Sequence, residues 1–294
     1  MDMRPRLIDL NIFIVKYIFR FRFRVAGWSR KSKIMNKIIQ KVVFEGDGTY
    51  FIPNPKSVSK ENIEKNKNTT ITSTIEINKR IQVVDKIVTP TDFIKNIIKQ
   101  SDDIVIMDKC LCRRSEGCDD YPIDLGCVFI GKTTKKISRK HCREATQEEA
   151  IEHIDKCDEA GLIHVLGRNK MDTIWMNVRP GDELLTICNC CPCCCLWRVY
   201  PNLSDEIQKD FYKLPGVSIS LEENTCIKCK KCISVCYADA IKFNDKIQIN
   251  QDICIGCGQC TLNCPTDSIR LNYENVEVES VFNKIDSLVK INNK

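Results

Sequence analysis

The chain has 294 residues, 20 of them cysteine, and a formal net charge of +6. This length allows two domains that each bury a core. The sequence opens without a cationic and then apolar segment that ends at a small-residue cleavage site, which argues against a secreted, disulfide-bonded protein. We therefore expect a cytoplasmic protein whose dense thiols bind metal.

The positive charge is concentrated in residues 1–50, which hold eleven Lys or Arg and four Asp or Glu. Within this segment, arginines interrupt the apolar stretch LIDLNIFIVKYIFRFRFRVAGW, and no apolar run in the chain reaches the 18–20 residues of a spanning helix. We predict a basic amphipathic arm over residues 1–40. It either packs on the main domain with its arginines in water, or contacts a membrane surface peripherally, or binds an acidic partner protein. Nucleic-acid binding would rest on this arm alone and is the weakest hypothesis.

Residues 41–205 are predicted to form an α+β domain rich in cysteine. Strands over 42–44 and 50–52, joined by a glycine turn, indicate a hairpin, and the polar segment 54–70 is expected to be a surface loop. Further strands are expected at 71–77, 81–84 and 104–106, and Pro90-Thr91-Asp92 indicates the start of a helix over 93–99.

Twelve cysteines lie before the last 70 residues, and ten of them are candidate ligands of one further metal site. They come in two groups: Cys110, Cys112, Cys118 and Cys127, then Cys188, Cys190, Cys191, Cys193, Cys194 and Cys195. Thiolates at this density select zinc, copper(I) or an iron–sulfur cluster. A further cluster, a zinc ion and free or catalytic thiols all remain open for this site.

A helix is predicted between the two cysteine groups. Thr146 and Glu149 have the spacing of a capping box, apolar residues recur at helical spacing through residue 160, and Gly161 is suited to end the helix. Cys157 lies on the apolar stripe and is therefore predicted to be a core residue. Cys142 is ambiguous.

The three histidines have separate predictions. His153 falls on the polar face of that helix and is expected to be solvated, whereas His164 alternates with apolar neighbours and is expected to be a hydrogen-bonded strand residue. His141 is the best histidine candidate for a proton donor or a metal ligand. Short strands are expected at 162–165, 173–175 and 184–187.

Residues 215–275 contain one cysteine spacing twice. CIKCKKCISVCYADAI and CIGCGQCTLNCPTDSI align without gaps, each as C-x2-C-x2-C-x3-C. In this motif the fourth cysteine of each run binds the cluster of the other run. One [4Fe-4S] cluster should therefore take Cys226, Cys229, Cys232 and Cys264, and the other Cys254, Cys257, Cys260 and Cys236. Tyr237 stands where the motif usually has proline. Residues 276–294 are expected to be a C-terminal tail.

The repeated motif resembles the two-cluster [4Fe-4S] ferredoxin domain. The wider pattern, KCLCRRSEGCDDYPIDLGCVFIG, EEAIEHIDKCDEAGLIHVLGRNK and LLTICNCCPCCC, is similar to a family of anaerobe and archaeal proteins described only as ferredoxin-type. This resemblance spans roughly residues 40–272. It implies a cysteine-rich front domain that accompanies a ferredoxin domain.

We predict an iron–sulfur electron-transfer protein that passes electrons between a low-potential donor and a redox partner protein. The alternative is an iron–sulfur oxidoreductase: a reductase whose front cysteines form the catalytic site and whose ferredoxin domain is an internal electron wire. A third hypothesis gives the clusters a structural role only.

Overall fold

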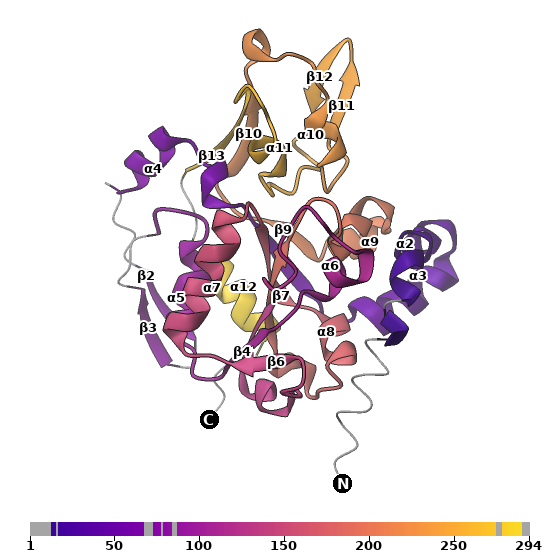
Figure 1. Ribbon diagram of the computed structural model, residues 1–294, viewed down its shortest axis with the longest axis vertical. Helices are drawn as coiled ribbons and strands as arrows, with labels where there is room; N and C mark the ends of the chain where they lie inside the picture. The colour runs from indigo at the N-terminus through magenta and orange to yellow at the C-terminus, as the bar shows by residue number, and fades with distance from the viewer. Residues whose placement is uncertain are drawn as a thin grey trace.

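The computed structural model describes residues 13–15, 17–67, 73–77, 79–83, 87–274 and 278–289. It shows an α+β fold in which a seven-stranded sheet with helices forms the front domain and a smaller two-repeat domain lies at one end (Figure 1). Outside the C-terminal domain, the described α-helices are α2 (Arg22–Lys31), α3 (Lys33–Ile39), α4 (Lys60–Lys67), α5 (Asp92–Lys99), α6 (Leu111–Glu116), α7 (Gln147–Glu159), α8 (Lys170–Trp175), α9 (Asp205–Gln208) and α12 (Val278–Leu288).

The central sheet has the strand order β6-β4-β5-β8-β7-β1-β9. Its strands are β6 (Cys142–Glu144), β4 (Ile104–Met107), β5 (Val128–Ile130), β8 (Leu185–Cys190), β7 (Ile163–Arg168), β1 (Gly48–Ile52) and β9 (Phe211–Lys213). Neighbouring strands are antiparallel except β1 and β9, which pair in parallel. A separate antiparallel pair joins β2 (Ser73–Ile77) and β3 (Lys79–Val83).

The two faces of the sheet differ in chemistry. Side chains alternate between faces along a strand, and on β8 this places Leu185 and Ile187 in the core under α5, α7 and α12. In that core the rings of Phe93 on α5 and Phe282 on α12 lie 5.7 Å apart. The opposite face carries Cys188 and Cys190 and is covered by α6, α8 and the segment that follows β8. The two thiols of β8 therefore lie on the face opposite α5, α7 and α12.

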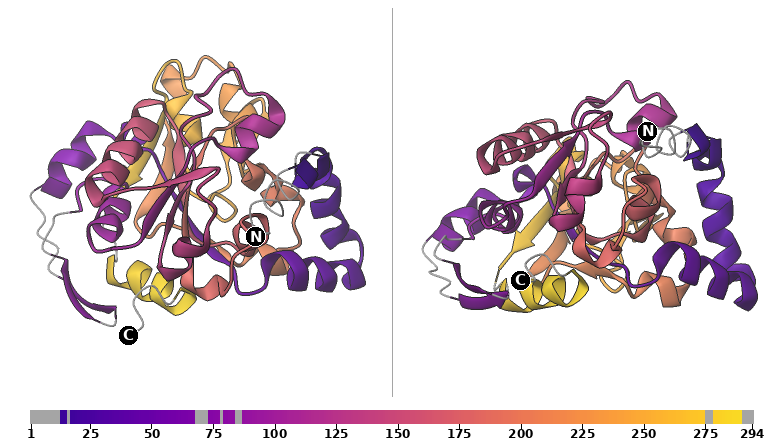
Figure 2. Two further views of the ribbon diagram at one scale, coloured as in Figure 1. Left: turned by 60° about the horizontal axis from the view of Figure 1, so that its bottom comes forward. Right: turned by 90° about the horizontal axis from the view of Figure 1, so that it is seen from below.

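The arm helices α2 and α3 lie on the side of the molecule opposite α5 and α7 (Figure 2). The arm buries Phe19, Ala26 and Ile39 against the front domain. Arg22 does not point into water, because it pairs with Glu116 at 2.7 Å. Many apolar side chains of the arm stay exposed: Phe13, Ile14, Tyr17, Ile18, Phe21, Phe23, Trp28, Ile34, Ile38 and Val42.

The C-terminal domain is built from two equivalent halves. β10 (Val217–Leu221) pairs with β13 (Ile269–Tyr273), and β11 (Ile241–Asn244) pairs with β12 (Lys246–Ile249), both antiparallel. Each half has one short helix, α10 (Lys231–Ser234) or α11 (Gln259–Leu262). The residues after this domain include α12, which returns to the core of the front domain.

Several predicted elements are confirmed. The helix over 93–99 is α5, the capping box of Thr146 is present at the start of α7, and Cys157 is fully buried. The strands predicted at 71–77, 81–84, 104–106, 162–165 and 184–187 are present, with bounds that differ by a few residues, as β2, β3, β4, β7 and β8. Residues 71, 72 and 84 lie outside the described residues.

Three predictions of secondary structure are wrong. Residues 42–44 belong to a helical turn, Gln40–Phe44, that continues the arm, so β1 forms no hairpin with them and pairs with β7 and β9 instead. Residues 173–175 belong to α8, which begins because the side chain of Asn169 accepts the N–H of Met171. The segment 54–70 is not simply a loop, since it contains α4, where Asn62 is buried and accepts the N–H of Tyr273.

Candidate metal centres

The two cysteine loops of the C-terminal domain share an unusual backbone. Lys228, Lys230 and Asp239 in the first half have φ values of +55°, +63° and +52°. Their equivalents 28 positions later, Gly256, Gly258 and Asp267, have φ values of +65°, +76° and +50°. Left-handed residues turn successive backbone N–H groups to one side, which favours anionic thiolates. The duplication therefore extends from the cysteine spacing to the backbone conformation.

The second loop encloses four thiols in one pocket. Cys236, Cys254, Cys257 and Cys260 line it together with apolar side chains such as Ile219, Ile241 and Ile255. This is the set that the sequence assigns to one cluster. The sulfur of Cys236 accepts the backbone N–H of Ala240 at 3.3 Å, and burial raises the pKa of Cys257 to about 12. A buried thiolate set of this kind suits an iron–sulfur cluster, which supplies the positive charge that burial demands.

The first loop is more open to solvent. Cys226 and Cys229 lie close enough to Cys232 to raise its pKa by charge repulsion, after the larger effect of burial. Cys229 is exposed, and Cys226, Cys232 and Cys264 pack against one apolar core. The set predicted for this cluster is therefore less buried than the other set, with Cys232 as its one buried member.

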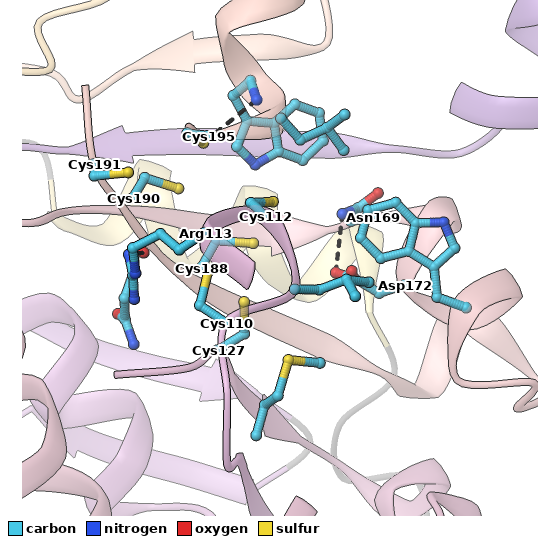
Figure 3. A pocket seen from close by; sticks show the side chains of 16 residues that line it. Cys110, Cys112, Arg113, Cys127, Asn169, Asp172, Cys188, Cys190, Cys191 and Cys195 are labelled. Carbon is cyan, nitrogen blue, oxygen red and sulfur yellow. Dashed lines mark hydrogen bonds between the residues drawn. The ribbon is translucent and has the colours of Figure 1, made fainter. Parts of the chain in front are cut away.

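In the front domain, seven cysteines line one cavity on the sheet face opposite α7 (Figure 3): Cys110, Cys112, Cys127, Cys188, Cys190, Cys191 and Cys195. They come from the end of β8 and the segment after it, from the residue before β5, and from the start of α6 after β4. Asn169, Asp172, Trp175 and Trp197 complete the wall. The antiparallel order β4-β5-β8 brings these segments together.

Two thiols of this cavity have a lowered pKa. The pKa of Cys188 lies well below its ordinary range, because the thiols of Cys127 and Cys190 donate to its sulfur. The pKa of Cys110 is lowered to about 6, because Cys112 donates to it and the charge of Arg113 lies nearby, against the opposing effect of burial. The donor thiols have a raised pKa, chiefly through the same hydrogen bonds and through burial. Thiolates are the form that binds metal, so the contacts in this cavity favour metal binding at Cys188 and Cys110.

Arg113 is fully buried beside these thiols. It donates through Nη1 to the carbonyl oxygen of Asn189 at 2.8 Å and through Nη2 to that of Leu125. A buried cation at this position lowers the free energy of a negatively charged thiolate cluster. From the sequence, Arg113 could tune a cluster, bind an anion or be plain surface charge, and the structure places it inside the cavity wall.

Behind the thiols, a polar network crosses the sheet. Asn189 lies between Cys188 and Cys190, and its side chain points to the other face of the sheet. There Oδ1 of Asn189 forms a hydrogen bond with Nδ1 of His164 at 2.8 Å, and Nε2 of His164 forms one with Oδ1 of Asp158 at 3.0 Å. The prediction of a hydrogen-bonded strand histidine is confirmed. The prediction for His153 is wrong: it is buried and bonds the carbonyl oxygen of Gly126 at 2.9 Å. Its face of α7 is polar because it meets this network.

A second thiol group lies beside the cavity and shares one member with it. The sulfur atoms of Cys118, Cys191, Cys193 and Cys194 all lie within 4.8 Å of one another. The ten candidate cysteines of the front domain thus divide into two groups, one around the cavity and one at the surface. Cys142 and Cys157 belong to neither group, although Cys157 is buried in the same apolar cluster as Cys118, Cys191 and Cys194. His141 lines a separate pocket with Asp108 and Arg114.

Tyr237 connects the two domains. It is fully buried, its hydroxyl donates to the carbonyl oxygen of Cys191, and its ring packs on Phe51 with the ring centroids 6.0 Å apart. Arg198 donates to the carbonyl oxygens of Pro192 at 2.7 Å and of Ser234 at 3.1 Å. Sequence reasoning missed this bridge, although the absence of the usual proline at position 237 was a signal.

Comparison with known families gives one match. Residues 219–271 match the model of the 4Fe-4S dicluster domain. The chain is thus an iron–sulfur protein with a ferredoxin-like 4Fe-4S domain at its C-terminus, a class that serves electron transfer in general. No curated protein matches the chain. Among the described residues, no helix is long and apolar enough to cross a membrane.

Proposed function

We propose that the protein transfers single electrons through two [4Fe-4S] clusters in its C-terminal domain and a further iron–sulfur cluster in the front cavity. The observation that carries the proposal is the pocket lined by Cys236, Cys254, Cys257 and Cys260, since it contains the full predicted ligand set of one cluster. Cys226, Cys229, Cys232 and Cys264 form the other set. When bound, such clusters supply reversible one-electron acceptance and donation.

The first loop is the docking side for a redox partner protein. Cys229 and the surrounding Lys228, Lys230 and Lys231 are all exposed. A short distance to solvent favours electron exchange with a partner, and the lysines favour an acidic one, because complementary charge steers encounter. In this proposal the protein is cytoplasmic, receives electrons from a low-potential donor and passes them to an acidic partner protein that binds at this surface.

The second loop faces the front domain. Cys257 and Cys260 are buried, and Tyr237 and Arg198 fix this half of the domain to the segment that carries Cys191. This contact supports one redox unit that comprises the C-terminal domain and the front cavity.

The second candidate function is a reductase whose front cavity is the catalytic site. The observation in its favour is the number of cysteines in the cavity wall, seven, where a [4Fe-4S] cluster uses about four. Surplus thiols are nucleophiles once they are deprotonated. Turnover of a substrate with a chemical reductant, abolished by substitution of surplus thiols, would favour this function over electron transfer alone.

For the arm we propose peripheral contact with an anionic membrane surface. Its exposed aromatic and aliphatic side chains, together with its basic residues, have the composition of interfacial segments. Sedimentation with anionic vesicles should fall in the variant Ile34→Glu, because Ile34 is 72% exposed and its substitution leaves the core intact. If the unsubstituted protein sedimented equally with neutral and with anionic vesicles, the proposed role of the basic residues in binding would be contradicted.

Metal counting with EPR tests the main proposal. The full chain is purified without oxygen, iron and sulfide are measured per chain, and a reductive titration is followed by EPR. We expect about twelve irons and signals from coupled clusters. About eight irons would confine the clusters to the C-terminal domain and refute the front cluster, and an iron-free protein would refute the whole proposal.

A further inference from the structure

We infer that Cys118, Cys191, Cys193 and Cys194 form a mononuclear zinc site, separate from the iron–sulfur sites and outside the proposed electron-transfer function. The assignment divides the front thiols into a set for iron around the cavity and a set for zinc at its edge.

The spacing of the sulfur atoms carries this inference. The Sγ of Cys193 lies 3.6 Å from that of Cys118, 3.5 Å from that of Cys191 and 3.5 Å from that of Cys194. A tetrahedral ion with Zn–S bonds of about 2.3 Å separates its sulfur ligands by about 3.8 Å. The three separations from Cys193 thus match the size that zinc requires, and all four sulfur atoms lie within 4.8 Å of one another.

The same spacing excludes two alternatives for this group. The thiolates of a [4Fe-4S] cluster bind four different irons at the corners of a cube, so their sulfur atoms lie much farther apart than those around one ion. A disulfide joins sulfur atoms at about 2.05 Å, which is far shorter than any of the three measured separations.

The local backbone has the features of a zinc-binding turn. Cys191 and Cys194 have the C-x2-C spacing of structural zinc sites, and the N–H of Cys194 points to the Sγ of Cys191 at 3.4 Å. On the other side, the backbone N–H groups of Asp120 and Tyr121 point to the sulfur of Cys118. Such N–H donors orient metal-bound thiolates and spread their charge.

The position of the site indicates its role. Cys118 follows α6 directly, after Gly117, whose φ of +65° ends that helix in a left-handed turn. Cys193 is exposed, which gives an ion a path from solvent, whereas Cys118, Cys191 and Cys194 are buried. The ion would join the end of α6 to the segment after β8. That segment lines the thiol cavity and accepts the hydrogen bond of Tyr237. Zinc would therefore stabilise the segment at the point where it meets the C-terminal domain.

Zinc analysis of the full chain tests the site. The protein is produced with iron and zinc both supplied, purified without oxygen, and measured by elemental analysis and by X-ray absorption at the zinc edge. We expect about one zinc per chain with about four sulfur neighbours at about 2.3 Å. Absence of zinc, zinc with nitrogen or oxygen neighbours, or iron bound at this group would overturn the assignment.

Variants locate the ion within the chain. Cys193→Ser changes an exposed ligand and should lose most of the zinc to a chelator while the iron content stays unchanged. Cys142→Ala is the matched control, because Cys142 is buried on β6 and belongs neither to the cavity lining nor to the second thiol group, and it should keep zinc and iron. Parallel loss of iron in Cys193→Ser would instead place this thiol in a cluster.

The X-ray absorption spectrum of the unsubstituted protein at the zinc edge tests the zinc site even if a variant fails to fold. Iron content separates failure of the zinc site from failure of the proposed electron transfer.

Discussion

The thiols of the C-terminal domain and those of the front domain are assembled in opposite ways. In the C-terminal domain, three cysteines of each set come from one loop of seven residues, and the fourth comes from the matching loop. In the front domain the thiols come from segments around β4, β5 and β8, as far apart in the chain as Cys110 and Cys195. The first arrangement is local in sequence, whereas the second depends on the order of strands in a sheet.

The two regions also neutralise negative charge differently. The C-terminal loops use left-handed backbone, which directs N–H groups at the thiols. The front cavity uses a buried guanidinium, Arg113, and hydrogen bonds between thiols. Metal content should therefore respond to loop substitutions in one region and to substitutions in the sheet core in the other.

The largest expected effect comes from the C-terminal domain. Cys257→Ser replaces a buried ligand of the second loop and should remove about four irons per chain. The measurement is iron and sulfide content of anaerobic protein, with Cys142→Ala as the control for loss of a buried thiol. Retention of all iron in Cys257→Ser would contradict the ligand assignment.

The next effect concerns the front cavity. Cys188 lies in the cavity wall, where the thiols of Cys127 and Cys190 donate to its sulfur and lower its pKa, so Cys188→Ser should remove the front iron and leave the C-terminal clusters in place. The expected result is a loss of about four irons with the C-terminal EPR signals preserved. Unchanged iron content would mean that the front cavity holds no cluster. Loss of all iron would mean that the two regions are not independent.

The contrast between local and sheet-built sites explains what the sequence could predict. The repeated spacing of Cys226 to Cys236 and Cys254 to Cys264 reveals the C-terminal domain directly, because loop geometry is set by adjacent residues. Helix α7 was predictable for the same reason, since its capping box and apolar stripe are local.

The division of the front thiols was not predictable from spacing. Cys191 and Cys190 are adjacent, yet Cys190 lies in the cavity with Cys188 while Cys191 also contacts Cys118 and its neighbours. Only the register of β8 against β5 and β7, and the end of α6 at Gly117, decide which thiols meet. The burial of His153 was missed because its partner, the carbonyl of Gly126, comes from a distant segment.

Tyr237 tests whether the two regions are mechanically coupled. Tyr237→Phe removes the hydroxyl that bonds the carbonyl oxygen of Cys191 and leaves that buried acceptor without it. We expect the free energy of unfolding to fall by about 1–2 kcal/mol, measured by anaerobic urea denaturation. The matched control is Tyr273→Phe, because the buried hydroxyl of Tyr273 has no hydrogen-bond partner among the described residues and its removal should not destabilise the protein. Equal effects of the two substitutions would argue against a specific bridge.

The smallest effect compares the two halves of the C-terminal domain at equivalent left-handed positions, Lys228 and Gly256. A lysine at φ +55° is strained by about 1–2 kcal/mol. Lys228→Gly relieves this strain, but glycine gives the unfolded chain extra freedom worth about 0.5–1 kcal/mol. The variant should therefore be more stable by at most about 1.5 kcal/mol. Gly256→Ala should be destabilising, because its Cβ would lie 2.8 Å from Cγ1 of Val217 at a φ of +65°. Anaerobic urea denaturation measures both variants. Opposite signs are expected, and a destabilising Lys228→Gly would show that Lys228 makes a stabilising contact that outweighs its backbone strain.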